Sequence, residues 1–297
     1  AYRDYFDDYL SVLEPRLVEA HRVLKSNGSL YFHIDYREVH YCKILLDEIF
    51  GRDSFLNEII WAYHGPSPIR SAFNRKHDMI LFYSKSSDYT FNVDQIRVPY
   101  ASNTVETFKS SKKAGFGKVP DLERGKVPED WWYFPVVARL HKERTGYPTQ
   151  KPEALMERII RASSNPGDLV ADFFGGAGTT AVVANRINRR FISSDIMPRA
   201  LTTSRSRLVL DQESFAGKGT EERRDLTPVL IQREEQYPAQ IYLDMESLDI
   251  GLPQRKDGMI SLPEDLLSQA VFWEIDPDYN GEVFHSRYQA ARPWRKG

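Results

Sequence analysis

The sequence has little cysteine: Cys42 is the only one among 297 residues. A single cysteine excludes an intrachain disulfide and any metal site that needs several cysteine ligands. This composition is typical of the reducing cytoplasm, which is the location we expect. Cys42 lies in an apolar helical pattern with no evident catalytic partner, so it is a weak candidate for a nucleophile.

Long hydrophobic runs and an excess of basic charge are also absent. No apolar run approaches the ~20 residues that a transmembrane helix needs, so we predict no membrane partner. The N-terminus lacks the charged and then apolar pattern of a secretory leader, and it begins at Ala1 in the middle of a pattern, from which we expect a trimmed or incomplete chain. The net charge of −2 excludes a uniformly basic surface but not a local contact with nucleic acid.

What is present is enough apolar sequence for a substantial core. Hydrophobic residues make up 41% of the chain, and the length fits either one large domain or one domain with a smaller attachment. Periodicity predicts helices and strands in alternation, which indicates an α/β fold. The predicted helices cover residues 2–24 (interrupted near Pro15), 37–50, 152–162 and 199–210. The predicted strands cover residues 29–34, 55–61, 77–84, 89–93, 168–172 and 188–195.

Two stretches depart from this alternation. From residue 94 to 145 the periodicity breaks down, and ten Lys and Arg residues stand against six acids between Arg97 and Arg144. A solvated insertion accounts for this charge as well as a nucleic-acid contact does. Beyond residue 213 the composition becomes linker-like. We therefore predict a domain over residues 1–213 with an insertion at 94–145, and an extension of unknown role over residues 214–297 with a β-hairpin at Asn280-Gly281.

The most informative motif runs from Asp168 to Thr180. An apolar strand ends in Asp172, a glycine-rich turn follows, and small residues begin a helix; a second short strand then ends in Asp195, 23 residues after Asp172. This order predicts a βαβ unit with a nucleoside pocket at its carboxyl edge. A plain strand-to-helix turn is the alternative. The unit lies more than halfway along the chain, which indicates a permuted order of elements.

The residues of this turn favour S-adenosylmethionine over NAD as the nucleoside. The glycines are Gly175, Gly176 and Gly178, but position 181 is alanine, so the third glycine of the phosphate-cradling Gly-x-Gly-x-x-Gly pattern is missing. Asp172 on the pocket floor repels a pyrophosphate and attracts an ammonium group. Asp195 lies near the offset of about 20 residues at which an acid meets ribose hydroxyls.

A second motif, Thr149-Gln150-Lys151-Pro152, precedes this unit. The simple interpretation is an ordinary helix start, in which Thr149 is the cap and the prolines stiffen the chain. The functional interpretation is an anion site, because a free helix N-terminus beside Lys151 suits the carboxylate of a methionine. The residues alone leave both interpretations open.

Taken in order, these motifs resemble those of permuted, β-group DNA amino-methyltransferases of restriction-modification systems. The resemblance rests on residues 149–152, 172–180 and 191–195, joined upstream by residues 28–35, 57–61 and 76–85, and it covers roughly residues 1–210. It implies a doubly wound, Rossmann-like sheet and methyl transfer from S-adenosylmethionine to adenine N6 or cytosine N4 of a base flipped out of DNA, with adenine favoured. The implied cofactor residues are Thr149, Gln150, Lys151, Asp172, Phe173, Phe174, Gly175, Gly176, Gly178, Thr179, Thr180 and Asp195.

His33 and Asp35 end a strand that we expect at the same edge of the sheet. We include both among the cofactor candidates, since a role at the cofactor or base pocket fits this place. A structural pair of hydrogen-bonded side chains fits it equally well.

One element of the family is missing from the sequence. The family carries an Asp-Pro-Pro-Tyr-type tetrapeptide just before the helix that we place at residue 2, where it binds the target amine and stacks on the base, and no such tetrapeptide occurs here. Asp276-Pro-Asp-Tyr279 echoes it only superficially. We therefore assign no catalytic residue, and we expect either a longer native polypeptide or an inactive form. Phe173-Phe174-Gly175 also stands where the family often has proline, phenylalanine and cysteine.

The resemblance places target recognition at residues 94–145, where basic side chains would hold phosphates. The candidate DNA contacts, with a solvated loop as the alternative for the first four, are His64, Arg70, Arg75, Lys76, Lys109, Lys112, Lys113 and Lys118. Duplex DNA is the expected partner and no metal is expected, while a restriction subunit and a second copy of the chain stay open. The competing functions are a nicotinamide-dependent dehydrogenase, a non-catalytic DNA-binding subunit that retains the cofactor fold, and an enzyme acting on RNA.

Overall fold

The structure is a computed structural model, and it describes residues 9–66, 69–110 and 120–216 together with four short strands at 254–256, 259–261, 272–275 and 288–291. The chain forms two compact units, which we treat separately. The first comprises residues 1–144, 151–170 and 188–190, and the second comprises residues 145–150, 171–187 and 191–297.

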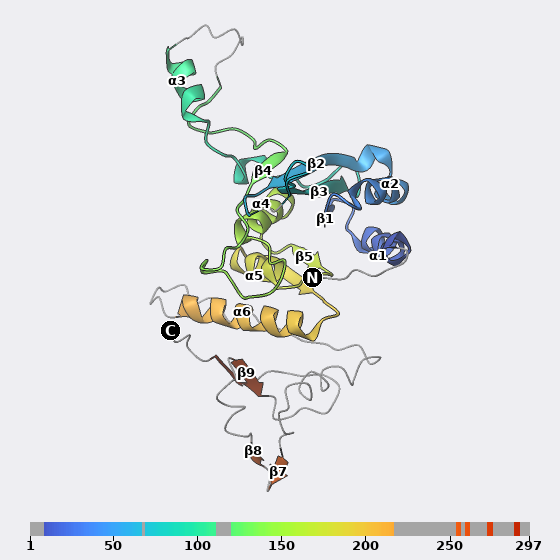
Figure 1. Ribbon diagram of the computed structural model, residues 1–297, viewed down its shortest axis with the longest axis vertical. Coiled ribbons are helices and arrows are strands. Elements are labelled where there is room, and N and C mark those ends of the chain that lie inside the picture. Colours follow the sequence, from blue (N-terminus) through green and yellow to red (C-terminus); the bar gives the residue numbers. More distant parts are fainter. Residues whose placement is uncertain are drawn as a thin grey trace. The chain divides into compact units, whose positions relative to one another are not determined.

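A four-stranded sheet lies at the centre of the first unit (Figure 1). Its strands are β1 (Ser29–Ile34), β2 (Phe55–Ala62), β3 (His77–Ser84) and β4 (Trp131–Tyr133). The spatial order is β1-β3-β2-β4, with β3 antiparallel to β1 and β2, and β4 parallel to β2. The side chains of β3 from Met79 to Tyr83 are all buried, as expected of a strand that is covered on both faces. The strands predicted at residues 29–34, 55–61 and 77–84 are confirmed.

Helices supply the cover on both faces of this sheet. The helices are α1 (Tyr9–Val23), α2 (Val39–Phe50) and α4 (Glu153–Ser163). Successive side chains of a strand point to opposite faces, so Leu81 and Tyr83 of β3 pack in one core cluster with α1 and α2, whereas Ile80 and Phe82 pack in another with α4. The first unit therefore has the helix-sheet-helix layering of a doubly wound α/β fold.

Helix α1 continues through Pro15, so the predicted interruption is wrong. Proline lacks a backbone N–H and is disfavoured inside a helix. Leu13 and Leu17, two residues to either side of it, are buried in the core, while Pro15 itself is exposed. The burial of this apolar face offsets the hydrogen bond that Pro15 cannot donate.

The segment near residue 90 forms no strand, so the strand predicted at residues 89–93 is wrong. The side-chain amide of Asn92 donates to the carbonyl oxygens of Arg161 (3.1 Å) and Ser164 (2.8 Å). These bonds tie the segment to the end of α4 rather than to a sheet edge. A 3-10 turn, η2 (Val93–Gln95), follows, and the insertion also contains α3 (Ser102–Ser110) and the edge strand β4. The insertion thus has more regular structure than its sequence pattern indicates.

A βαβ unit follows α4 in the chain, and its loop and helix belong to the second unit. Its elements, with the helix that comes after it, are β5 (Leu169–Asp172), α5 (Thr179–Arg186), β6 (Arg190–Ser193) and α6 (Pro198–Ala216). The two strands are parallel, because backbone bonds run from Arg190 N to Asp168 O (2.9 Å) and from Ser194 N to Asp172 O (3.0 Å). This unit and the layers around the four-stranded sheet confirm the predicted α/β class. The βαβ unit comes after that sheet in the sequence, as the permuted order requires.

Four short strands are described beyond α6. They are β7 (Gln254–Lys256), β8 (Met259–Ser261), β9 (Phe272–Ile275) and β10 (Tyr288–Ala291). They form two antiparallel pairs, β7 with β8 and β9 with β10, and Ile275 lies opposite Tyr288. The second strand of the β9–β10 pair covers residues 288–291. The turn predicted at Asn280-Gly281 lies outside the described residues.

The structure also shows the surroundings of Cys42, the single cysteine. Cys42 is fully buried in α2, and burial raises the pKa of its thiol to about 11, so the thiol is protonated and unreactive at neutral pH. None of the helices in the described part of the chain is long and apolar enough to cross a membrane. Among the same residues, no cluster of His, Cys, Asp and Glu side chains could hold a metal ion.

Candidate functional site

Asp172 ties the end of β5 to the glycine-rich loop that follows it. One carboxylate oxygen accepts a hydrogen bond from the backbone N–H of Phe174 (3.1 Å), and the other accepts one from the hydroxyl of Thr180 (2.6 Å). The side chain therefore spans the loop as far as the first turn of α5. It is only half-buried, and an ionised carboxylate has about four acceptor positions. Asp172 can thus hold the loop and still accept hydrogen bonds from a ligand.

Asp195 approaches the same loop from the neighbouring strand. One of its carboxylate oxygens accepts a hydrogen bond from the backbone N–H of Gly176 (2.8 Å), and the other accepts one from Met197 (2.9 Å). The backbone bond from Gly175 N to Ser194 O (2.9 Å) fastens the loop to this strand end as well. The structure thus brings the two predicted carboxylates, from adjacent strand ends, to one loop at residues 173–178.

Glycine is required at two positions of this loop. Gly176 and Gly178 have φ angles of 51° and 70°, which L side chains rarely adopt. A Cβ on Gly178 would lie 2.8 Å from the Cα of Ser204 in α6, and a Cβ on Gly176 would lie 3.3 Å from the ring of Tyr147. Close packing against α6 and against a buried aromatic ring therefore explains these glycines, in addition to any ligand.

The helix that follows the loop is packed tightly. Thr179 and Thr180 are both buried, and the hydroxyl of Thr179 accepts a hydrogen bond from Arg207 of α6 (2.9 Å). Thr180 donates to Asp172, as described above. The two threonines, predicted as cofactor residues, thus hold the start of α5 in place.

Apolar side chains beside the two carboxylates are exposed. Phe173 and Phe174 in the loop are 45% and 65% exposed, and Ile196 and Met197, directly after Asp195, are 79% and 47% exposed. The sequence reasoning missed Ile196 and Met197, although an apolar pair directly after a strand-ending acid is a readable signal. These side chains offer an apolar ring a surface next to groups that accept hydrogen bonds.

The Thr149-Gln150-Lys151 motif is held mainly by its own neighbours. Thr149 has a left-handed backbone (φ 61°), and its hydroxyl donates to the carbonyl of Pro148 (2.6 Å). The side-chain oxygen of Gln150 accepts hydrogen bonds from the backbone N–H and the hydroxyl of Thr145, both at 2.9 Å. The described contacts of Thr149 and Gln150 thus shape the chain segment itself.

The start of α4 fits neither a helix capped by Thr149 nor a free helix N-terminus that could bind an anion. The N-cap residue is Pro152, so the expected threonine cap is wrong. The first helical N–H, that of Glu153, donates to the carboxylate of Glu143 (3.0 Å). An acid of the chain itself therefore occupies this helix N-terminus, which weakens the interpretation of the motif as an anion site.

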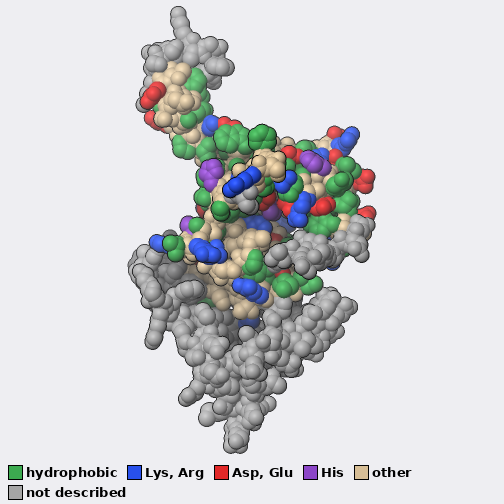
Figure 2. All heavy atoms as spheres, in the orientation of Figure 1, with side chains coloured by type: hydrophobic (Ala, Val, Ile, Leu, Met, Phe, Trp, Pro, Cys, Tyr) green, Lys and Arg blue, Asp and Glu red, His purple; other side chains and the backbone are tan. Residues whose placement is uncertain are grey.

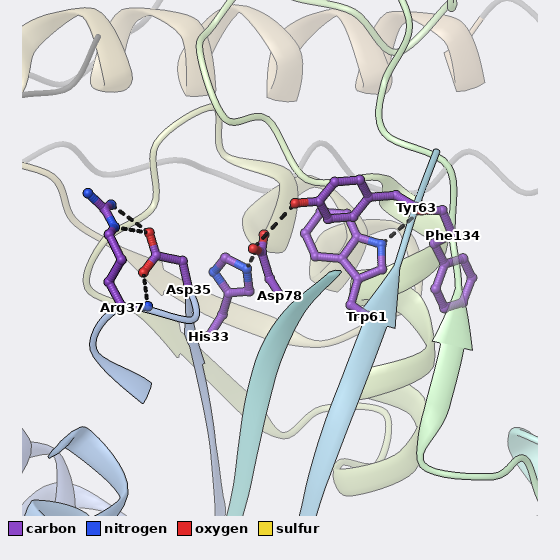
Figure 3. A network of polar contacts seen from close by, with 7 residues as sticks. All are labelled: His33, Asp35, Arg37, Trp61, Tyr63, Asp78 and Phe134. Carbon is purple, nitrogen blue, oxygen red and sulfur yellow. Dashed lines mark hydrogen bonds and ion pairs between the residues drawn. The ribbon is translucent and has the colours of Figure 1, made fainter. Parts of the chain in front are cut away.

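A second polar group lies at one edge of the four-stranded sheet in the first unit. Asp78, at the start of β3, accepts a hydrogen bond from the Nε2 of His33 at the end of β1 (3.3 Å) and one from the hydroxyl of Tyr63 just after β2 (3.3 Å). Figure 3 shows Asp78 between the two. The antiparallel pairing of β3 with β1 and β2 brings these chain positions together. Trp61 lies beside them and donates to the carbonyl of Phe134 (2.8 Å).

The histidine and the tyrosine of this group are both uncharged at neutral pH. Burial lowers the pKa of His33, and Lys151 lowers it further, against the opposing effect of the hydrogen bond to Asp78. Burial, reinforced by Asp78, raises the pKa of Tyr63 to about 12. At neutral pH, His33 is therefore a neutral imidazole and Tyr63 a neutral phenol. Asp78 and Tyr63 were not predicted, because the sequence alone does not give the strand pairing.

Asp35 belongs to a different contact, contrary to its pairing with His33 among the predictions. Its carboxylate accepts hydrogen bonds from the backbone N–H (2.9 Å) and the Nε (2.8 Å) of Arg37 (Figure 3). Burial acts to raise the pKa of Asp35, but the bonds and charge of Arg37 outweigh it and lower the pKa. Asp35 thus shapes the turn after β1.

The predicted DNA-binding residues are only partly described. His64 lies against the ring of Tyr133 (5.2 Å between centroids), the guanidinium of Arg75 lies over Tyr36 (4.4 Å), and Lys76 donates to the carbonyl of Pro66 (2.8 Å). Arg70 is exposed. Outside the described residues or side chains lie Lys109, Lys112, Lys113 and Lys118. On the face shown in Figure 2, blue Lys and Arg side chains are scattered among acidic and apolar ones.

Comparison with known proteins identifies relatives of the chain. Type II methyltransferase M.HpaI of Haemophilus parainfluenzae is 34% identical over 211 residues, which cover 71% of this chain and 62% of that protein. Type II methyltransferase M1.MboII of Moraxella bovis is 37% identical, with 64% and 74% covered. DNA adenine methyltransferase YhdJ of Escherichia coli is 34% identical, with 65% and 63% covered. The chain thus spans less than two thirds of the length of M.HpaI and YhdJ.

The comparison with solved structures finds PvuII DNA methyltransferase (cytosine-N4-specific). It is 17% identical, with a TM-score of 0.49, and the match covers 70% of this chain and 74% of that one. A family model described as DNA methylase matches residues 2–206. That match spans both the four-stranded sheet and the glycine loop, and it confirms the resemblance in the sequence motifs. The chain belongs to the DNA methylase family.

Proposed function

We propose that this protein transfers a methyl group from S-adenosylmethionine to an exocyclic amine of a base in duplex DNA. The observation that carries the proposal is the meeting of two half-buried carboxylates, Asp172 and Asp195, at one glycine loop. Membership of the DNA methylase family supports the same reaction. The target base would have to leave the helical stack to reach the methyl donor.

The loop suits S-adenosylmethionine in the chemistry of its groups. Asp172 would accept hydrogen bonds from the ammonium, Asp195 from the ribose hydroxyls, and the exposed Ile196 would lie against the adenine ring. No pyrophosphate has to be accommodated next to these negative charges, which disfavours NAD and the dehydrogenase alternative. When bound, S-adenosylmethionine supplies a methyl group made electrophilic by the sulfonium. The residues of the loop bind and orient it.

The polar group around Asp78 suits a base rather than a charged ligand. Neutral His33 and Tyr63 lie at the carboxyl ends of β1 and β2, the edge at which α/β sheets bind ligands. Their hydrogen-bonding groups could recognise the edge of an extruded base. We assign them to base positioning and not to proton transfer.

Adenine N6 is our preferred target, and cytosine N4 is the alternative. Both atoms are exocyclic amines, so the same reaction serves either base. The preference rests on the name of the relative YhdJ, a DNA adenine methyltransferase. We further propose duplex DNA as the partner and the reducing cytoplasm as the location, while a restriction subunit and a second copy of the chain stay open.

A non-catalytic DNA-binding subunit is the second candidate function. Such a protein would keep the cofactor loop and the DNA-binding surface without the chemistry.

Tritium transfer from labelled S-adenosylmethionine to duplex DNA tests the proposal. We expect label on the DNA and not on RNA of the same sequence, and chromatography of the nucleosides should place it on N6-methyladenine. Binding of both S-adenosylmethionine and DNA without transfer would favour the non-catalytic subunit. Binding of NADH in place of S-adenosylmethionine would contradict both candidates.

A further inference from the structure

An open hollow of about 290 Å³ lies in the first unit, and the site described above uses only one of its lining residues, Phe134. Three of its lining residues are apolar, and the other four are polar or charged. It is bounded by α4, by the end of the 3-10 turn η2 and by the segment after β4. Its lining residues are Gln95, Ile96, Phe134, Ala154, Glu157, Arg158 and Arg161.

Arg158 is the most unusual side chain in this hollow. Its guanidinium lies 4.6 Å from the ring centroid of Phe134 and 5.1 Å from that of Trp132. These rings cover part of the cation without accepting ordinary hydrogen bonds. Within the part of the chain that the structure describes, no side chain or carbonyl accepts a hydrogen bond from the guanidinium. Its donors are therefore left to water or to a ligand in the hollow.

The charges of the lining leave Arg158 uncompensated. Arg161 is paired with Glu157, at 2.7 Å between Nε and Oε1, so this pair is neutral as a whole. The hollow thus has one excess positive charge, that of Arg158. Burial lowers the pKa of the Arg158 guanidinium, but an arginine keeps its proton in proteins. A partly desolvated cation attracts an anion more strongly than a fully hydrated one.

We propose that this hollow binds a phosphate group through the fork of N–H donors on Arg158. A planar guanidinium matches two oxygens of a phosphate at once. The single excess charge suits a phosphodiester or a singly charged monoester, and the apolar walls at Ile96 and Phe134 suit the attached sugar. Such a phosphate could come from the backbone of DNA or from a free nucleotide or phosphate ion.

Phosphate binding to the full chain tests this site directly. We would titrate inorganic phosphate into the wild type, Arg158→Gln and Arg52→Gln by calorimetry, and follow the Arg158 Nε–H signal by NMR in the wild type and in Arg52→Gln. Arg52 is the matched control, because its side chain is 89% exposed and lies outside the hollow. We expect saturable binding in the wild type that Arg52→Gln retains, together with at least tenfold weaker phosphate binding to Arg158→Gln by calorimetry.

A second arm identifies the source of the phosphate. If the phosphate belongs to DNA, Arg158→Gln should reduce the slope of log Kd against log salt for duplex DNA by about one, whereas Arg52→Gln should not. Saturable phosphate binding with an unchanged DNA slope would assign the site to a free phosphate ligand. Equal phosphate binding by wild type and Arg158→Gln, with equal DNA slopes, would overturn the proposal. The methyl-transfer proposal has different readouts and would survive that result.

Discussion

At the scale of single residues, Asp172 and Asp195 each hold the local backbone by hydrogen bonds. Asp172 accepts hydrogen bonds from Phe174 in the glycine loop and from Thr180 at the start of α5, whereas Asp195 accepts one from Gly176 in the loop and one from the backbone of Met197. Both carboxylates keep acceptor capacity for a ligand. His33 is set differently: it is a neutral side chain that burial keeps neutral, hydrogen-bonded to the one carboxylate of its group. The loop thus presents two carboxylates to a ligand, whereas the group at the sheet edge presents the neutral side chains of His33 and Tyr63.

The buried state of His33 predicts a pH dependence of stability. Its folded pKa lies below the ordinary value of 6.5, so the unfolded chain takes up a proton first as the pH falls. The free energy of unfolding should therefore fall as pH drops below about 6.5 and level off once the folded state is also protonated. His33→Gln should flatten this dependence by up to about 1.4 kcal/mol per pH unit, measured by urea unfolding between pH 7.5 and 5.

The control for this experiment is His40→Gln, because His40 is an exposed histidine of α2. Part of the dependence should survive in the His33 variant, since burial and Lys85 also lower the pKa of His21. Identical slopes in the wild type and in His33→Gln would contradict a neutral, buried His33.

Residues that lie in one local motif could be predicted from the sequence, and residues that meet through strand pairing could not. Asp172 and Asp195 follow from the strand-turn-helix-strand pattern. Asp78 joins His33 only because β1 and β3 pair with His33 opposite Ile80, and no sequence pattern fixes that register. Cys42 lies inside a predicted helix and Asp35 directly after a predicted strand, yet only the structure shows that Cys42 is buried in the core and that Asp35 binds Arg37.

At the scale of elements, the glycine loop and α5 pack closely against α6. The buried start of α5 and the glycines before it allow α6 to approach closely. The predicted bounds of β1, β3, α2 and α4 agree with the observed ones to within two residues, whereas α6 extends beyond the predicted end at residue 210. The predictions failed where a single side chain decided the outcome, as with Asn92 near α4, or where packing outweighed propensity, as with Pro15 in α1.

A pair of glycine substitutions tests this packing. Gly178→Ala should lower the free energy of unfolding by about 2–4 kcal/mol. The new Cβ would clash with Ser204, and alanine would also have to adopt the left-handed backbone of this position. Gly146→Ala is the matched control: its φ is 78°, but no atom lies within 4 Å of the new Cβ, so it should show only about 1–2 kcal/mol. Equal losses in chemical denaturation would mean that the approach of α6 is not what requires Gly178.

At the scale of the whole molecule, the net charge of −2 hides an uneven distribution. Binding to DNA depends on a local basic surface and not on the net charge. The ordered motifs, the α/β class and the permuted order of the chain could all be predicted from the sequence. The secondary structure of the insertion could not, because its periodicity is weak and its helix α3 and strand β4 are short.

A triple substitution tests the insertion as a DNA contact. Replacing Lys112, Lys113 and Lys118 by glutamine should weaken binding to duplex DNA and reduce the slope of log Kd against log salt by up to about three. Fluorescence anisotropy over a salt series measures both. The control replaces Arg16, Arg22 and Lys25 in and after α1 in the same way. If both variants lose affinity alike, the effect comes from net charge and not from the insertion.

The most direct test of the central claim is a calorimetric titration of S-adenosylmethionine into the wild type, Asp172→Asn, Asp195→Asn and the exposed control Asp53→Asn. Loss of a charged hydrogen bond is worth about 1.5–3 kcal/mol, so the first two variants should each bind at least tenfold more weakly, and Asp53→Asn should bind like the wild type. Wild-type affinity in both loop variants, with their folds intact by circular dichroism, would contradict the claim that these two carboxylates hold the methyl donor.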